Sequence, residues 1–282
     1  MSKGRITAAA VGGFAAAGAA RYAYSVLRRT PPGGEKLWAR TNHRGEPVTL
    51  LEGPAVAAGA VIAALGTHPA IAVAGVGAAG FGAYDDLAGS GDRRGFRGHV
   101  GALMQGEVTT GAVKLGGIGA TGLVSACLAG GSPVDVALNA GLIAGGANLL
   151  NLFDLRPGRA TKVAVAAGGL LAVSSASAAE CAAPAVGAAL ALLPEDLGER
   201  AMLGDSGANA LGAMLGAAAA VSLPRPARLA ILAGIAGLTA ASEKVSFTKV
   251  IERTPALHWL DMLGRRPAAP TPKIPVPAVP EE

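Results

Sequence analysis

Cysteine, aromatic residues and charge are all scarce in this chain of 282 residues. Two cysteines, Cys127 and Cys181, lie in apolar stretches without the spacing of metal ligands, so no disulfide framework is expected. Aromatic residues make up 4% of the chain, too few for a platform on which nucleic-acid bases stack. Charged residues make up 15%, whereas soluble domains carry about a quarter. These shortages argue against a disulfide-framed protein, a nucleic-acid-binding protein and an ordinary soluble domain.

Hydrophobic residues and glycine are abundant instead. They account for 51% of the chain and for 42 residues respectively, and the mean hydropathy is +0.44. Small residues let helices pack closely in lipid, so this composition favours a membrane protein. The net charge of +5 suits an anionic membrane surface and does not require nucleic acid as a partner.

Nine apolar segments are predicted to form membrane helices, although several fall short of the ~20 residues that a span needs. They cover residues 6–27, 54–67, 69–84, 112–129, 134–153, 163–178, 179–193, 208–223 and 227–241. The expected fold is therefore an all-α integral membrane protein, a polytopic bundle of about nine transmembrane helices.

The connections between these segments alternate between two kinds. One kind is short and nearly uncharged, as at 67–69 and 130–135, and the other is long and basic, as at 28–53 and 194–207. Only four of the 24 Lys and Arg residues lie on the first side. Because Lys and Arg mark the cytoplasmic side, the N-terminus is predicted outside and the C-terminus inside. The first segment is expected to be a retained span and not a signal peptide.

Four aspartates lie where apolar segments end, and the predicted topology places all of them at the cytoplasmic end. They are Asp85, Asp86, Asp154 and Asp205. Carboxylates are costly at such positions and usually mark function. Several on one face can hold a divalent cation, which can in turn hold a pyrophosphate. A transporter is another class to consider, but it predicts charges at the membrane midplane and a repeat between the halves.

The aspartates also have structural explanations. The helix dipole disfavours Asp85 and Asp86 at a helix C-terminus, so a functional role and a merely solvated helix end both stay open. Asp205, between Gly204 and Ser206-Gly207, could cap the helix that follows it. Alternatively, the flanking glycines could let an anionic ligand approach the free N–H groups.

A polar stretch surrounds the third site. Asn148, Asn151 and Asp154 share one broad helix face and could bond to neighbouring helices or to phosphate and ribose. Arg156 and Arg159 follow in a helix-breaking stretch, and their guanidinium groups suit phosphate.

These stretches resemble the polyprenyl-phosphate N-acetylhexosamine-1-phosphate transferase superfamily, which includes phospho-N-acetylmuramoyl-pentapeptide transferase. Their order and spacing agree over roughly residues 5–245. The similar motifs are Arg44-Gly45-Glu46-Pro47-Val48, Ala83-Tyr84-Asp85-Asp86, Asn148-x-x-Asn151-x-x-Asp154 and Leu203-Gly204-Asp205-Ser206-Gly207.

The resemblance implies a Mg²⁺-dependent transferase of the bacterial cytoplasmic membrane. An undecaprenyl-type phosphate would attack the β-phosphorus of a nucleotide-sugar, which starts a cell-envelope glycan and releases a nucleoside monophosphate. By motif match the catalytic residues would be Asp85, Asp86 and Asp205, with Asp205 and Asp85 as metal ligands. Substrate would bind to Asn148, Asn151, Asp154, Arg156, Arg159 and Arg44. The lipid bilayer is its expected surroundings, and a homodimer is a further expectation.

The chain departs from the family pattern where the family recognises its nucleobase. Pro157 stands in place of a second aspartate, and Met202 stands where an aromatic residue often stacks on the base. The His-rich motif of the last loop is replaced by a segment with one histidine, His258. A catalytically silent relative that binds the lipid carrier or a partner is therefore the alternative to an active transferase.

Three parts are predicted along the chain. Residues 1–245 form the transferase-like membrane domain. Residues 246–265 form an amphipathic cytoplasmic segment, broken at Pro255, that lies along the membrane surface or packs against the cleft as a lid. Residues 266–282 are rich in proline and form a disordered tail.

Overall fold

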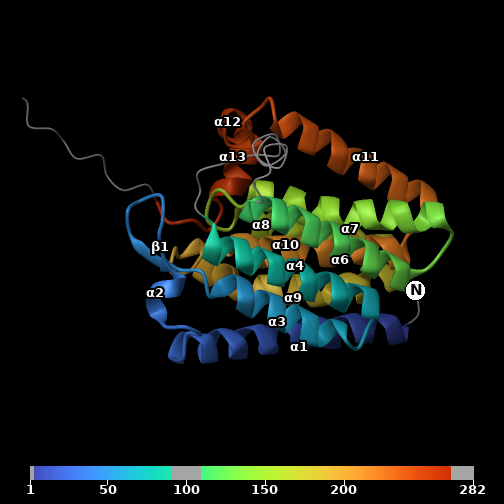
Figure 1. The fold of residues 1–282 in the computed structure, drawn as a ribbon, viewed down its shortest axis with the longest axis horizontal. Helices are drawn as coiled ribbons and strands as arrows, with labels where there is room; N and C mark the ends of the chain where they lie inside the picture. Colours follow the sequence, from blue (N-terminus) through green and yellow to red (C-terminus); the bar gives the residue numbers. More distant parts are fainter. Residues whose placement is uncertain (1–2, 90–108, 268–282) are drawn as a thin grey trace, which may run out of the picture.

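The computed structural model describes residues 3–89 and 109–267. In these ranges the chain is mostly helical, and the long helices run side by side (Figure 1). The long helices are α1 (Lys3–Arg29), α3 (Glu52–Ala64), α4 (Pro69–Ala88), α6 (Thr110–Ala129), α7 (Pro133–Phe153), α8 (Arg159–Ser174), α9 (Ala176–Leu197), α10 (Gly204–Ser222) and α11 (Arg225–Ser242). The short elements are α2 (Glu35–Trp38), β1 (Ala39–Thr41), β2 (Pro47–Thr49), α12 (Phe247–Arg253) and α13 (Pro255–Met262).

Each of the nine predicted apolar segments coincides largely with one long helix. Within the described residues, α6, α7 and α9 are long and apolar enough to cross a membrane. The pair α11 and α12, bent by 95°, would add a fourth if both belong to one span, and α3 is apolar but shorter. The chain is thus a helical protein with three to four candidate membrane helices, while nine spans and their orientation stay predictions.

One predicted boundary is wrong. The break expected between residues 178 and 179 lies at Ser175, where α8 has ended and α9 begins. The Ser175 hydroxyl accepts the N–H of Ala178 at 3.0 Å and so caps α9. This cap was hidden because the sequence around it is a continuous run of small residues.

The first long connection contains a small antiparallel sheet that the all-α prediction missed. Strand β1 pairs with β2, with Arg40 opposite Val48. Asn42 closes the hairpin, because its side-chain oxygen accepts the N–H groups of Arg44 and Glu46, each at 2.9 Å. Such side-chain bonds to the backbone are the usual reason for asparagine in turns.

Helix α10 is the centre of the bundle. Every residue from Ser206 to Ala220 is buried, and the helix packs mainly against α7, α4, α3 and α9. A Cβ atom at Gly212 or Gly216 would collide with the backbone of α7, and one at Gly207 would collide with Gly53 of α3. Small residues therefore allow the close approach that the composition indicates.

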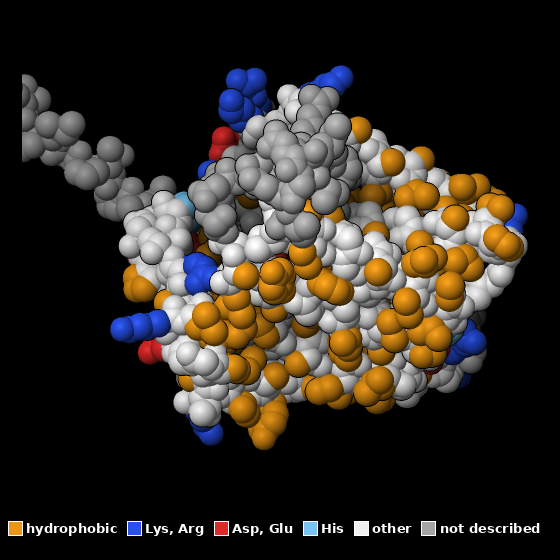
Figure 2. All heavy atoms as spheres, in the orientation of Figure 1, with side chains coloured by type: hydrophobic (Ala, Val, Ile, Leu, Met, Phe, Trp, Pro, Cys, Tyr) orange, Lys and Arg blue, Asp and Glu red, His pale blue; other side chains and the backbone are white. Residues whose placement is uncertain are grey.

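The outside of the bundle is apolar along much of its length. Figure 2 shows hydrophobic side chains spread over the visible long face, with many Lys and Arg side chains near the ends. Phe14 is 81% exposed and Val173 is 80% exposed. Extended apolar surface of this kind is unusual in a soluble monomer and is consistent with a membrane protein.

Successive helices end alternately at the two ends of the bundle (Figure 1). We call one of these the hairpin end. It holds β1 and β2, the last turns of α4 and α7, and the first turn of α10. The opposite end holds the short turns at 65–68, 130–132 and 223–224. The four aspartates therefore lie at the same end of the bundle, as predicted. This holds whether or not a membrane surrounds the helices.

Helices α12 and α13 pack on the hairpin end, and we call this pair the cap. The rings of Phe247 and Phe153 stack with centroids 4.9 Å apart, and Lys162 donates to the carbonyls of Leu260 and Asp261. The predicted break at Pro255 is confirmed, since α13 begins there. Of the predicted tail, Arg266 and Pro267 are described, and residues 268–282 lie outside the described ranges.

Candidate functional site

Three of the predicted aspartates meet a lysine at the hairpin end, and we call these four residues the carboxylate cluster. Asp85 and Asp86 come from the last turn of α4, Asp205 from the first turn of α10, and Lys114 from α6. The close approach of α4 to α10 depends on Gly82, because a Cβ atom there would collide with the backbone of Asp205. The cluster therefore joins three segments that are distant in sequence.

Asp86 caps α10 from the neighbouring helix. Its carboxylate accepts the N–H of Asp205 at 3.0 Å and that of Ser206 at 2.9 Å. Gly204 has φ +61°, and a Cβ atom there would lie 3.0 Å from the Asp86 carboxylate. The first-turn N–H groups attract an anion, as expected for a helix N-terminus, but the anion in the structure is Asp86 itself. This contact fixes where Asp205 lies relative to α4.

Lys114 bridges the other two carboxylates. Its Nζ atom lies 2.6 Å from an Asp85 oxygen and also forms an ion pair with Asp205. Asp85 takes a further hydrogen bond from the Thr110 side chain, one turn earlier on α6. The sequence prediction missed Lys114, although it is the one charged residue in the segment 110–129 and such a charge is a warning of function.

The predicted metal ligands, Asp85 and Asp205, lie within hydrogen-bonding distance of each other. In the described part of the chain no three His, Cys, Asp or Glu side chains are grouped as a metal site. A Mg²⁺ site does not need three such side chains, because Mg²⁺ usually binds one or two carboxylates and completes its coordination shell with water and substrate phosphates. Two carboxylates that already share a cation fit that requirement.

Asp154 lies beside the cluster. It follows the last residue of α7 and accepts a hydrogen bond from the N–H of Gly204, the residue before Asp205. Burial, together with the charges of Asp196 and Asp205, raises the pKa of Asp154 well above its ordinary value. Asn151 and Asn148 lie about one and two turns earlier on α7, respectively, and neither lines the cavities described below.

A cavity of about 260 Å³ opens next to Asp154. Its wall comes from the hairpin, the turn after α7, the end of α9 and the residues before α10. The lining residues are Asn42, His43, Val48, Asp154, Leu155, Arg156, Pro157, Asp196, Glu199, Ala201, Met202 and Leu203. Both residues at which the chain departs from the family pattern, Pro157 and Met202, are thus in this wall.

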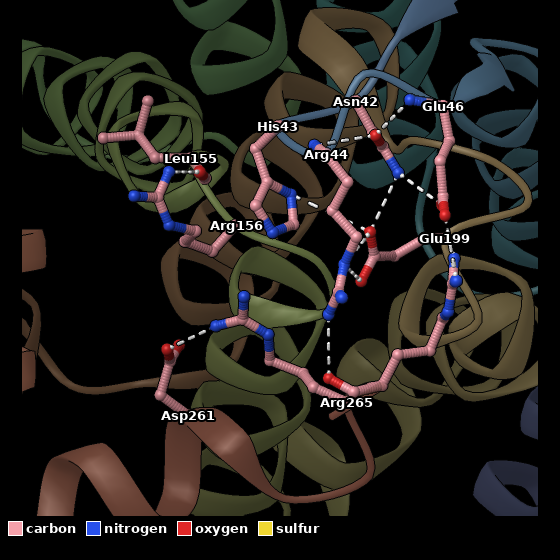
Figure 3. Close-up of polar contacts among 10 residues, drawn as sticks. Asn42, His43, Arg44, Glu46, Leu155, Arg156, Glu199, Asp261 and Arg265 are labelled. Carbon is pink, nitrogen blue, oxygen red and sulfur yellow. Dashed lines mark hydrogen bonds and ion pairs between the residues drawn. The ribbon is translucent and has the colours of Figure 1, made fainter. Parts of the chain in front are cut away.

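Glu199 ties the hairpin to the turn before α10 (Figure 3). It accepts a hydrogen bond from Asn42 at 2.8 Å and from the Arg44 Nε at 2.9 Å. Glu199 has φ +54°, a conformation that costs energy for a residue other than glycine, and its side chain is buried. This strained residue holds the rim of the cavity, and no local sequence pattern predicts it.

A second cavity of about 400 Å³ adjoins the first and shares His43 and Arg156 with it. Its other lining residues are Arg44, Glu252, His258, Asp261, Met262, Arg265 and Arg266. Burial and the nearby guanidinium groups lower the pKa of His43 despite the Glu199 carboxylate, which favours its neutral form. The four arginines leave this cavity rich in hydrogen-bond donors for an anion.

The three arginines predicted to bind substrate differ in the cavities that they line and in the groups to which they bond. Arg156 lines both cavities, and in the described ranges its side chain bonds only to the carbonyl of Leu155. Arg44 lines the second cavity but is paired with Glu199 and donates to the carbonyl of Arg266. Arg159 lines neither cavity, because its buried guanidinium makes two bonds to Asp261, at 2.7 and 3.0 Å. Arg156 is the best placed of the three for a ligand.

Comparison of the chain with known protein-family models gives no match, and comparison with curated proteins finds none either.

Proposed function

We propose that this chain transfers a sugar-1-phosphate from a nucleotide-sugar to a polyprenyl phosphate, with Mg²⁺, at the cytoplasmic face of a bacterial membrane. The observation that carries the proposal is the junction at Gly204. Its N–H bonds to Asp154 in the wall of the first cavity, and its neighbour Asp205 belongs to the carboxylate cluster. A donor lying across this junction would have its nucleoside in the cavity and its pyrophosphate at the carboxylates.

The reaction brings negative groups together. An oxygen of the lipid phosphate bonds to the β-phosphorus of the donor, and the bond from that phosphorus to the nucleoside monophosphate breaks. Such transfers depend on positioning and charge neutralisation. Mg²⁺ held by Asp85 and Asp205 would supply much of the neutralisation. Asp86 positions Asp205 through the first turn of α10, and Arg156 is available for a donor phosphate.

A second candidate is a catalytically silent relative that binds the lipid carrier or a partner. One observation favours it: Lys114 is already ion-paired with both carboxylates that the reaction would need for a metal. The departures at Pro157 and Met202 lie in the cavity where the nucleoside would bind.

Release of nucleoside monophosphate separates the two candidates. Purified full-length chain is mixed with undecaprenyl phosphate, Mg²⁺ and a panel of UDP-, CDP- and GDP-sugars. An active transferase releases the monophosphate of one donor only when lipid and Mg²⁺ are both present. Asp205→Asn is expected to lower the rate at least about 100-fold, because it removes a charge that acts on the transferring group.

Asp135→Asn is the matched control for this experiment. Asp135 is also an ion-paired carboxylate, but it lies in the first turn of α7, at the opposite end from Asp154. Its loss is expected to leave the rate of the folded protein within about threefold. No release with any donor, from protein whose thermal unfolding is cooperative, would support the silent relative.

A further inference from the structure

The carboxylate cluster contains its own cation. The Lys114 ammonium contacts both Asp85 and Asp205, and all three side chains are largely shielded from solvent. The exposed fraction of the side chain is 14% for Lys114, 16% for Asp85 and 25% for Asp205. Two carboxylates this close would repel each other strongly if no positive charge stood between them. Lys114 therefore offsets part of the repulsion within the pair.

The rest of α6 shows that this contact is specific. The helix carries no other charged residue, and its first two turns present Thr110 and Lys114 to the same carboxylate, Asp85. Burying a lysine is costly, so the ion pairs must compensate for the loss of water. The Asp86 carboxylate is engaged by N–H groups of α10 and leaves Lys114 to the other two.

We infer that Lys114 is a built-in counter-ion that keeps the Asp85–Asp205 pair in place without metal and gives it up when a divalent cation binds. The ammonium group and the cation need the same oxygen atoms, so the two cannot occupy them together. Lysine suits this exchange because its charge sits on a flexible four-carbon stem. Tethered to α6, the displaced ammonium stays beside the cation, where it meets the oxygens of any phosphate that the cation holds.

This inference rests on the proposed function for the phosphate but not for the exchange of cations. It makes Lys114 a positioning residue in the absence of substrate and a phosphate-binding residue in its presence. It also accounts for the observation that favours a silent relative, because a pair of carboxylates that shares Lys114 is then the resting state of a metal site.

Binding of Mn²⁺ tests the exchange without any substrate. The free Mn²⁺ signal in electron paramagnetic resonance gives the affinity of purified full-length chain, and Mg²⁺ competition checks the site. Lys114→Met is expected to bind Mn²⁺ about tenfold tighter or more than the natural chain, because a competing charge is gone. Lys114→Arg keeps that charge and is expected to show no such gain in affinity. Lys162→Met, which removes a lysine far from the cluster in sequence and contact, is the matched control.

Unchanged or weaker Mn²⁺ binding by folded Lys114→Met would overturn the inference. A second measurement covers the case in which that variant does not fold. In the natural chain, acetylation of the Lys114 amine by a small acylating reagent, followed by peptide mass spectrometry, is expected to rise severalfold when Mn²⁺ saturates the site. Acetylation of Lys162 is expected to stay constant, and equal reactivity of Lys114 with and without Mn²⁺ would contradict the exchange.

The two proposals can fail separately. Tighter Mn²⁺ binding by Lys114→Met with no monophosphate release from any donor would leave the exchange standing and remove the transferase. Transfer by the natural chain, together with no effect of Lys114→Met on Mn²⁺ affinity, would support the transferase and overturn the exchange.

Discussion

Two carboxyl groups near the hairpin end differ in whether their oxygens have hydrogen-bond partners. Asp86 accepts two N–H groups of α10, whereas Glu52, the first residue of α3, is completely buried and neither of its oxygens has a hydrogen-bond partner in the described part of the chain. A buried polar group without a partner costs free energy. Asp86 therefore supports the structure, and Glu52 weakens it.

Replacing Glu52 should stabilise the protein. Glu52→Met keeps a similar volume and removes both unpartnered oxygens, so the free energy of unfolding is expected to rise by about 1–3 kcal/mol. Thermal unfolding of the purified chain measures the change. Glu243→Met, at an exposed position after α11, is the control and is expected to change stability by less than about 0.5 kcal/mol. Loss of stability in Glu52→Met would contradict this expectation and show that the Glu52 carboxyl group stabilises the folded state.

The sequence could predict some of these residues because they break a local pattern. Each of the four aspartates lies at one end of an apolar segment, and the structure brings Asp85, Asp86 and Asp205 together with Asp154 beside them. Lys114 places a charge inside the apolar segment 110–129, and the rule that charges in apolar segments mark function could have found it. Glu199 and Glu52 could not, because their importance depends on packing partners that are distant in sequence.

At the scale of elements, the cap is held by a small number of strong contacts. Asp261 is buried and accepts hydrogen bonds from Arg159 on α8 and from Arg265. Breaking a buried ion pair from one side typically costs about 3–5 kcal/mol. Because the cap has few buried apolar residues, this pair carries much of its attachment.

The attachment of the cap should depend on pH. Burial raises the pKa of Asp261, but Arg159 and the neighbouring cations outweigh it, so the pKa lies below its ordinary value of 3.8. A carboxylate with a lowered pKa stabilises the folded state above pH 3.8, and this contribution is lost as the pH falls through the folded pKa. Because Trp259 on α13 is already exposed, its emission anisotropy, in a Trp38→Phe background, is expected to shift downward as the cap detaches in that window.

Asp261→Asn should already be detached at pH 7, with little further shift on acidification. Glu252→Gln, on the exposed side of α12, should behave like the unaltered chain. A shift of the same size and midpoint in Asp261→Asn would show that another group controls the cap.

Element boundaries were predictable where a cap residue or proline marks them. Pro69, Pro133 and Pro255 each lie at the start of a helix, and Ser132 forms a capping box with Asp135. The boundary at Ser175 and the hairpin were missed, because one lies in a uniform run of small residues and the other has strands of three residues. Strands this short leave no alternating pattern in the sequence.

At the scale of the whole molecule, the long basic connections lie at the hairpin end, as far as the structure describes them, and the short uncharged ones lie at the opposite end. The number of spans and their direction in a membrane remain predictions, since apolar length supports three to four helices. Which helices pack together was not predictable either. The central place of α10 depends on glycines that fit the backbones of α7 and α3, and a single sequence does not say which backbones those are.

Chemical labelling should establish the orientation. In a Cys127→Ala, Cys181→Ala background, Lys3→Cys is expected to react with a membrane-impermeant maleimide in intact cells, and Glu35→Cys only after lysis. These exposed residues flank α1 on opposite sides. We expect this orientation because Lys and Arg are in excess on the hairpin side, which the positive-inside rule places in the cytoplasm. Labelling of Glu35→Cys but not Lys3→Cys in intact cells would invert the topology and place the candidate site outside.

The contact between the first loop and the end of the described chain has a consequence for biosynthesis. Arg44 donates to the carbonyl of Arg266, and Arg266 pairs with Glu46, across more than 200 residues. The second cavity needs both sides of this contact, so it cannot exist on the ribosome until almost the whole chain has been synthesised. A chain cut short after α11 would contain all the long helices and lack that cavity.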